Sequence, residues 1–227
     1  MSFQKKLNRR SLLKLGFGAV AGTISSKLLA FDSEDSPCEA TPKDVSGPFY
    51  PTQGKGEKDV DLTALQGHTD RAEGQIIHVR GRVLDNECNP VAGALVEVWQ
   101  ANKWGRYHHE ADPNPAPRDP HFQGWGQAVT DGEGNFHFKT IFPGSYPAED
   151  NWTRPPHIHF RVARRGYHEL VTQMYFSGQE LNNHDRLLLA IPEEDRSKLI
   201  VDFDKDAQNI EAGAKLCHFD LTLQRFS

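Results

Sequence analysis

The sequence predicts an all-β fold, an antiparallel β-sandwich with long loops and a short helical region near the C-terminus. Many short segments rich in β-branched and aromatic residues are separated by clusters of Gly, Pro, Asn and Asp. Only the stretch 182–199 has helical character, and Pro192 divides it into two short pieces. The chain has 227 residues and no tandem repeat, so one domain is expected.

The expected strands follow one another with turn signals between them. Turn residues at 86–90 end the first strand, and the sequence Asp-Gly-Glu-Gly at 131–134 joins two strands as a hairpin. Long irregular segments in compact domains are usually functional or disordered, so 101–125 is expected to be a functional loop. Two further loops are expected at 54–74 and 142–156. The strands are expected at 76–85, 94–100, 126–130, 135–141, 157–162, 169–176 and 218–223.

The N-terminus resembles a bacterial twin-arginine (Tat) export signal. Arg9 and Arg10 precede a mildly apolar run rich in Gly and Ala. We predict a signal peptide over 1–30, an extended arm over 31–46 and a β-sandwich domain over 47–227. The mature protein is then expected to be periplasmic or secreted. A disordered basic tail is the alternative for the first segment.

Charge and cysteine content limit the partners. Six of the 26 Lys and Arg residues lie within 1–30, together with none of the 31 Asp and Glu residues. Removal of that segment changes the formal charge from −5 to −11, which argues against nucleic acid or an anionic membrane as a partner. Cys38, Cys88 and Cys217 allow at most one internal disulfide, and sequence does not select the pair. Three isolated thiols are the alternative.

One short segment gathers side chains that bind metals. In a β-strand, His157, His159 and Arg161 lie on one face, and the apolar residues between and after them lie on the other. Tyr146 precedes this strand, and Tyr107 lies in the long loop. Two phenols and two imidazoles are therefore the candidate ligands.

The donor set indicates which metal would fit. Iron(III) prefers anionic oxygen donors, and two tyrosinates with two neutral imidazoles would leave it a net positive charge. Zinc more often takes a third histidine or a carboxylate, and no phenolate. A non-haem iron(II) site would need a carboxylate beside its two histidines, and no acid follows either histidine in an H-x-D or H-x-E pattern. Taken singly, each residue has a structural explanation as a surface pair, a buried aromatic or a loop anchor. The other nine histidines are interpreted as solvent-facing or hydrogen-bonding residues.

Taken together, the motifs resemble those of the intradiol ring-cleavage dioxygenases. The similarity runs in order from Gly47 to Gly178 through GPFYP, VxGRVLD, PVAGALVEVWQANKWGRYHH, DPHFQGWGQAVTDGEGNFHFKTIFPGSYP, WTRPPHIHF and LVTQMYFSG. The resemblance implies an oxidoreductase of aromatic hydrocarbon catabolism with one non-haem Fe(III) per chain. It implies cleavage of a catechol- or protocatechuate-type diol between its hydroxyls, with both atoms of O2 entering a cis,cis-muconate-type diacid.

The resemblance also implies roles for individual residues. The metal ligands of the family correspond to Tyr107, Tyr146, His157 and His159. Tyr146 matches the tyrosinate that leaves the metal and takes up a proton when substrate binds. Arg154 and Gln173 match catalytic residues that also belong to the substrate pocket: an arginine beside the substrate ring and a glutamine. Tyr50 and Trp99 match aromatic positions around the substrate.

Some positions depart from the family. Ala148 stands where protocatechuate enzymes usually carry tryptophan, and Cys88 stands where a glycine or serine is usual. The segment before Gly47 is too short for the helical dimerisation segment of catechol-type members. The chain therefore looks closest to the β subunit of protocatechuate 3,4-dioxygenase, and a homo-oligomer or a complex with a related subunit is expected. The alternative is a non-catalytic transthyretin-like or carboxypeptidase-regulatory-like binding module, which the stretch Thr130–Phe136 also fits.

Overall fold

A computed structural model describes residues 38–51 and 57–226 of the chain. The predicted signal peptide over 1–30 and the first part of the predicted arm lie outside the described residues. Within those residues, no helix combines the length and the apolar character needed to cross a membrane.

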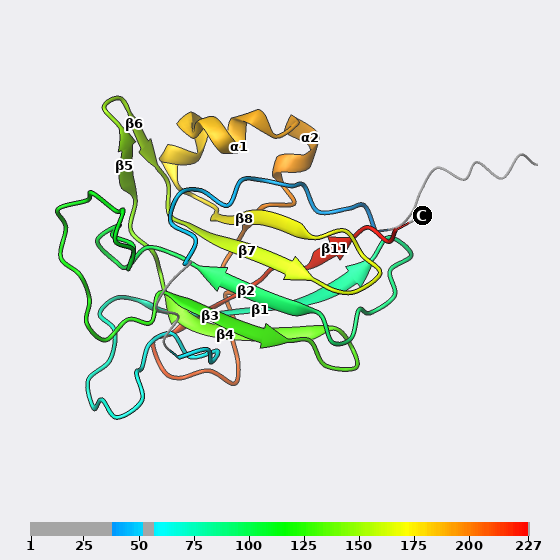
Figure 1. Cartoon of the computed structure of the whole chain (residues 1–227), viewed down its shortest axis with the longest axis horizontal. Coiled ribbons are helices and arrows are strands. Elements are labelled where there is room, and N and C mark those ends of the chain that lie inside the picture. The colour runs from blue at the N-terminus through cyan, green and yellow to red at the C-terminus, as the bar shows by residue number, and fades with distance from the viewer. Residues whose placement is uncertain (1–37, 52–56, 227) are drawn as a thin grey trace, which may run out of the picture. The chain divides into compact units, whose positions relative to one another are not determined.

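Two mixed sheets form the domain (Figure 1). In the first, β1 (Ile76–Asp85) pairs antiparallel with β4 (Asn135–Ile141) and parallel with β10 (Lys215–His218) and β11 (Leu221–Leu223). The second has the order β3-β2-β7-β8-β9. Its strands are β3 (Trp125–Val129), β2 (Leu95–Trp99), β7 (His157–Ala163), β8 (Leu170–Phe176) and β9 (Ile200–Val201).

A hairpin and three short helices complete the described elements. Strands β5 (Tyr146–Glu149) and β6 (Trp152–Arg154) pair with each other and stand at one end of the second sheet (Figure 1). Between β8 and β9 the chain forms a 3₁₀ helix, η1 (Glu180–His184), followed by α1 (Arg186–Ala190) and α2 (Glu193–Arg196). Helices α1 and α2 lie beyond the β8 side of that sheet (Figure 1).

The predicted all-β sandwich is confirmed, and so are the two short helices on either side of Pro192. Two local predictions were wrong. The expected loop at 142–156 contains the β5–β6 hairpin. The pairing of these strands is interrupted between Pro147 and Glu149, so the sequence shows no regular alternation of apolar and polar residues there. The segment expected as one strand at 218–223 is divided between two strands: its first residue ends β10, and its last three form β11. The two strands pair with β1 on opposite sides of Gly81.

A close backbone approach at Gly81 explains the break. A Cβ atom at this position would lie 2.0 Å from the carbonyl oxygen of Phe219. The Phe219 amide donates to the Arg80 carbonyl at 2.9 Å, and the Arg82 amide donates to the Asp220 carboxylate at 2.8 Å. Because the residues between β10 and β11 bond to β1 in this irregular way, the ladder is interrupted although the chain continues along β1.

The two faces of β7 differ as the sequence predicted. Ile158, Phe160 and Val162 are at most 1% exposed and belong to the main hydrophobic core. Each fully buried side chain of this size contributes roughly 1.5–3 kcal/mol to folding. The apolar face therefore fixes β7 in the sheet, and His157 and His159 are directed to the opposite face.

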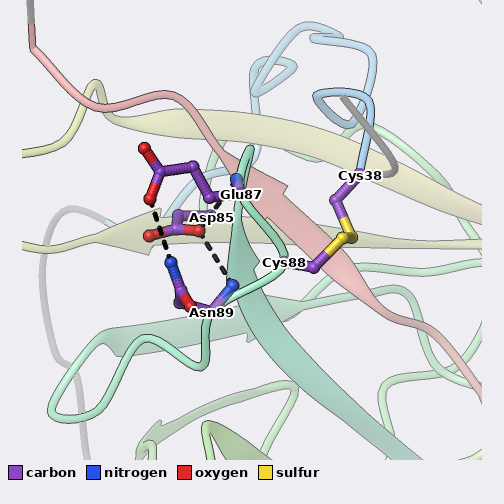
Figure 2. The surroundings of a disulfide bond; sticks show 5 residues. All are labelled: Cys38, Asp85, Glu87, Cys88 and Asn89. Atoms are coloured by element: carbon purple, nitrogen blue, oxygen red, sulfur yellow. Dashed lines mark hydrogen bonds between the residues drawn. A yellow bond between two sulfur atoms is a disulfide. The ribbon is translucent and has the colours of Figure 1, made fainter. Parts of the chain in front are cut away.

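A disulfide joins the start of the described chain to the turn after β1 (Figure 2). Cys38 and Cys88 are bonded, with Cα atoms 5.3 Å apart. Cys88 has a φ of 64°, a left-handed conformation that explains why glycine suits this turn. The Asp85 carboxylate accepts the backbone amides of Glu87 at 3.0 Å and Asn89 at 2.9 Å. The third cysteine, Cys217, is buried and free. The structure thus selects the pair that the sequence left open.

The residues after Cys38 follow the edges of both sheets without forming a strand of their own. The Thr41 amide donates to the Thr222 carbonyl at 3.2 Å, and the Thr222 amide donates to the Thr41 hydroxyl at 2.8 Å. Further along, the Asp44 amide donates to the Val171 carbonyl at 2.9 Å. Residues 38–46, the described part of the predicted arm, are therefore attached at several points.

We expect Asp85→Ala to lower the free energy of unfolding by about 2–4 kcal/mol. The carboxylate is fully buried, caps two amides and pairs with Arg225 at 2.6 Å. Burial opposes ionisation, but the amides of Asn89 and Glu87 and the Arg225 charge together lower the pKa of Asp85. The stabilisation is therefore present above the unfolded pKa of about 3.9 and is lost as pH falls through the lower folded pKa. Denaturant unfolding at several pH values measures it.

Asp131 provides the matched control. Its carboxylate accepts the amides of Glu133 at 2.9 Å and Asn135 at 2.8 Å in the same pattern, but it is exposed. Asp131→Ala should therefore destabilise the protein less than Asp85→Ala, because water replaces the lost hydrogen bonds. Equal losses in the two variants would contradict the role assigned to burial.

Candidate metal centre

Three neighbouring strands place a row of side chains on the outer face of the second sheet. The register sets Trp99 of β2 opposite His159 of β7, and His159 opposite Gln173 of β8. Two residues along, His157 lies opposite Tyr175. Since alternate residues of a strand share a face, these side chains form one cluster.

The two tyrosines reach this cluster from outside the sheet. Tyr146 begins β5, where it is paired with Arg154 of β6. Tyr107 lies in the long loop before β3, where its amide donates to the Asp112 carboxylate at 2.6 Å. The loop approaches the start of β5 so closely that a Cβ atom at Gly105 would lie 2.1 Å from the Ser145 carbonyl oxygen. This contact places the two phenol rings edge to face, with centroids 5.5 Å apart.

The polar atoms of the predicted ligands converge. The Tyr107 hydroxyl oxygen lies 3.2 Å from His157 Nε2 and 3.1 Å from His159 Nε2. His157 Nδ1 lies 2.7 Å from the Pro155 carbonyl oxygen, which can only accept, so Nδ1 carries the proton and Nε2 presents its lone pair to the centre. Tyr146 interacts with the Tyr107 phenol and the Arg154 guanidinium. The structure therefore brings together all four residues that the sequence singled out as ligands.

Burial controls the charges of this centre. Loss of hydration and the neighbouring Arg154 charge lower the pKa of His157 well below its usual value, and burial, His157 and Arg154 do the same for the pKa of His159. Burial raises the pKa of Tyr146 and, together with the neighbouring Tyr146, that of Tyr107. Both imidazoles are therefore neutral, and both phenols hold their protons until a cation takes their place.

This donor set fits a hard, highly charged cation. Two phenols that become anionic on binding and two neutral imidazoles supply two negative charges and four donor atoms. Nowhere in the described part of the chain, this centre included, are three His, Cys, Asp or Glu side chains grouped so as to hold a metal ion. The residues present therefore suit a ferric ion better than zinc, which favours histidine, cysteine and carboxylate ligands.

Trp99 and Tyr50 are the aromatic residues that the sequence placed around the substrate. In the structure Trp99 contacts a predicted ligand, whereas Tyr50 contacts Trp99. Trp99 stacks on the His159 imidazole, with centroids 4.8 Å apart and an interplanar angle of 6°. Tyr50 lies edge-on to Trp99, and its hydroxyl donates to the Glu97 carboxylate at 3.2 Å. Phe49, to which the sequence analysis gave no role of its own, contacts both predicted ligand tyrosines instead. Its ring centroid lies 4.8 Å from that of Tyr107 and 6.3 Å from that of Tyr146.

A cavity of about 420 Å³ borders the centre. Its wall includes Tyr107 and Trp99 together with Phe49, but not Arg154 or Gln173. Of the four predicted pocket residues, only Trp99 therefore lines this cavity, whereas Tyr50, Arg154 and Gln173 do not.

Arg154 has buried partners that the sequence interpretation missed. Its Nε donates to Asp185 Oδ2 at 3.0 Å and its Nη2 to Asp185 Oδ1 at 3.1 Å. Nη2 also donates to the Tyr175 hydroxyl at 2.9 Å, which in turn donates to the Asp44 carboxylate at 3.1 Å. Gln173 lies next to this chain, with Oε1 3.3 Å from the Tyr175 hydroxyl. Tyr175 could have been found from its spacing of two residues from Gln173 on one strand, whereas no pattern marks Asp44 or Asp185.

Comparison with known proteins identifies the class to which this fold and centre belong. A family model described as Dioxygenase matches residues 45–225. The chain belongs to the intradiol ring-cleavage dioxygenase family. Among its relatives is the protocatechuate 3,4-dioxygenase beta chain of Burkholderia cepacia, which is 42% identical over 185 residues, or 80% of this chain and 78% of that one. The resemblance inferred from the motifs is confirmed.

Catechol-cleaving enzymes are also similar. A catechol 1,2-dioxygenase of Candida albicans is 36% identical over 140 residues, covering 56% of this chain and 43% of that one. The crystal structure of 3-chlorocatechol 1,2-dioxygenase from Rhodococcus opacus superposes with a TM-score of 0.64 at 25% identity, covering 82% of this chain and 73% of that one. The predicted enzyme class is therefore confirmed, and the non-catalytic binding module is not retained.

Proposed function

We propose that the protein is an Fe(III)-dependent intradiol dioxygenase that cleaves a catechol-type diol between its two hydroxyl-bearing carbons. O2 would supply both oxygen atoms, and the product would be a cis,cis-muconate-type diacid. One observation carries the proposal: the Tyr107 hydroxyl and the Nε2 atoms of His157 and His159 converge beside Tyr146 in a buried site. These four side chains would hold one ferric ion per chain.

A bound ferric ion would supply the Lewis acidity that binds the diol as a dianion and activates its ring toward O2. The chain supplies the rest. Tyr146 would take up one substrate proton at its hydroxyl oxygen, since at 7% it is the most exposed of the four proposed ligands. Arg154 would stabilise negative charge that develops on the ring, since its guanidinium already interacts with Tyr146 and contacts His157.

The surrounding side chains would orient the ligands and limit the entry of water. Trp99 holds the plane of His159 by stacking, and Phe49 covers the two tyrosines. Gln173, fully buried beside His159 in the sheet, donates to the Val45 carbonyl at 3.0 Å and so links the arm to the centre. The diol would enter next to Tyr146, where Ala148 leaves more room than the tryptophan usual in protocatechuate enzymes.

The test is a visible absorption spectrum of the purified protein, recorded before and after anaerobic addition of catechol. Tyrosinate bound to Fe(III) gives a red charge-transfer band, and the band should shift when catechol chelates the metal. Admission of O2 should then produce the diacid and restore the first spectrum. Protein reconstituted with zinc is the control and should remain colourless and inactive. A protein that stays colourless and binds no iron after reconstitution would refute the proposal.

We further propose that the chain acts in an assembly, as a homo-oligomer or with a related subunit. The similar Burkholderia cepacia protein is named as a beta chain, which supports a companion subunit. Light scattering of the purified protein, alone and co-expressed with candidate companion chains, measures the assembly. A monomer that is fully active alone would refute it.

We also propose that the protein is exported to the periplasm or secreted by the twin-arginine route. The paired Arg9 and Arg10 support this, and so does the Cys38–Cys88 disulfide, because structural disulfides persist mainly in oxidising compartments.

Replacement of both arginines by lysine should retain the protein in the cytoplasm, because the substitution keeps the charge but removes the arginine pair. Cell fractionation and immunoblotting measure the distribution. The matched control changes Lys5 and Lys6 to arginine and should be exported. Undiminished export of the Arg9→Lys/Arg10→Lys variant would show that another route is used.

A further inference from the structure

We propose that Asp185 is a positioning residue for the ring-cleavage reaction: it holds the Arg154 guanidinium in the orientation that directs Nη1 to the metal centre. The inference rests on the proposed function and adds to it a residue that the sequence motifs do not include. It is carried by the geometry of a buried ion pair and by the way Asp185 is fixed in the fold.

The guanidinium has three nitrogen atoms, and two of them are bonded away from the centre. Asp185 binds Nε and Nη2 with both carboxylate oxygens, at 3.0 and 3.1 Å. The remaining nitrogen, Nη1, lies 3.2 Å from His157 Nε2. Because a two-point contact fixes both the place and the plane of a guanidinium, the carboxylate determines where Nη1 points.

Asp185 is itself held by the core. It is fully buried, and its Oδ1 accepts the Leu188 amide at 2.9 Å, which makes Asp185 the N-cap of α1. Leu188 is 2% exposed and belongs to the main hydrophobic core. Asp185 therefore connects Arg154 to the hydrophobic core through the N-terminal end of α1. The position of Arg154 does not depend on the exposed β5–β6 hairpin alone, to which Arg154 belongs.

A second contact limits rotation of the same guanidinium. Tyr175 accepts from Nη2 at 2.9 Å and donates to the Asp44 carboxylate at 3.1 Å. Arg154 is 3% exposed, so an unpaired positive charge here would be costly and the side chain would turn toward any other acceptor. Other acceptors around the guanidinium are the His157 imidazole, the Tyr175 hydroxyl and the Asp44 carboxylate beyond it. Loss of the Asp185 charge is thus expected to move Arg154 without removing a metal ligand.

Asp185→Asn separates pairing from capping. The amide oxygen can still cap α1, since asparagine is a good N-cap residue, but the amide group presents N–H donors to the guanidinium and carries no charge. We expect the variant to fold, to bind iron at the wild-type stoichiometry and to lose roughly 100-fold in kcat, as for a catalytic group displaced by about 1 Å. The shift of the visible band on anaerobic catechol binding should change as it does in Arg154→Lys.

A double-mutant cycle decides between positioning and general destabilisation. If Asp185 acts through Arg154, Asp185→Asn should cause little further loss of kcat in the Arg154→Lys background. The control is Asp119→Asn, which changes another buried aspartate that accepts backbone amides, those of Glu73 at 2.7 Å and His121 at 2.9 Å. It should keep the wild-type kcat.

Wild-type kcat in Asp185→Asn, or fully additive losses in the double variant, would overturn the inference. An inactive wild-type protein would instead refute the proposed function. In that case the same double-mutant cycle can be measured on the free energy of unfolding, where it still tests whether Asp185 and Arg154 are coupled. A coupling energy of zero would overturn the inferred ion pair between them.

Discussion

His157→Ala is expected to abolish metal binding, with iron affinity reduced by more than roughly 100-fold. The imidazole is 2% exposed, its tautomer is fixed by the Pro155 carbonyl, and its Nε2 atom is directed at Tyr107. Alanine would remove one of four donors and leave Arg154 without the partner of its Nη1. Elemental analysis after reconstitution with iron, together with the visible spectrum, measures the loss.

His168→Ala provides the control for this result. His168 is exposed, lies in the turn before β8, and contacts Phe226 at the C-terminal end instead of the centre. The variant should bind iron and show the wild-type spectrum. Unchanged iron content in His157→Ala would show that the ligand assignment is wrong, even if activity were lost.

Tyr146→Phe is expected to keep the metal but to lower kcat/KM by roughly 10²–10⁴-fold, the usual contribution of a positioned proton acceptor. Three donors remain in the variant, so iron should bind more weakly without being lost. The substrate would have no phenolate to receive its proton at this position. The charge-transfer band should lose the part that belongs to one tyrosinate. Stopped-flow absorbance with catechol would measure the slower binding step.

Two further variants place this result in context. Tyr107→Phe removes the phenol that lies within 3.2 Å of both histidines, so it should reduce iron binding more than Tyr146→Phe does. Tyr167→Phe changes a half-buried tyrosine in the turn between β7 and β8, where it contacts Arg225, and should alter neither spectrum nor rate. A Tyr146→Phe variant with wild-type kcat/KM would exclude Tyr146 as the proton acceptor.

Much of the fold could be predicted because local signals agreed with burial. The strand expected at 76–85 is β1, and its bounds were given by the alternation of the strand and by the turn residues after Asp85. The parallel pairing of β10 and β11 with β1 could not be predicted, because register between distant segments depends on close approaches such as that at Gly81. Periodicity within one segment carries no information about such contacts.

The two histidines and the two tyrosines of the centre could be predicted from the sequence for different reasons. The alternation of His157 and His159 forces both imidazoles to one face, so this half follows from strand geometry. The two tyrosines were candidates from their residue type, and the family resemblance implied their role as ligands. The structure shows that a close loop contact between Gly105 and Ser145 brings Tyr107 to Tyr146. Asp185 escaped detection because it reaches Arg154 through the tertiary arrangement of α1.

The disulfide at the beginning of the described chain has a consequence for proteolytic processing. Cys38 is bonded to the turn after β1, and from there the chain leads to Asp44, which contacts Tyr175 beside the centre. Any cleavage before residue 38 leaves this attachment intact. A nick between Cys38 and Asp44 would still leave both fragments covalently joined to the domain, one through sulfur and one through the backbone. If the predicted signal peptide is removed, the resulting N-terminus could vary in position before Cys38 without releasing Asp44 from the domain.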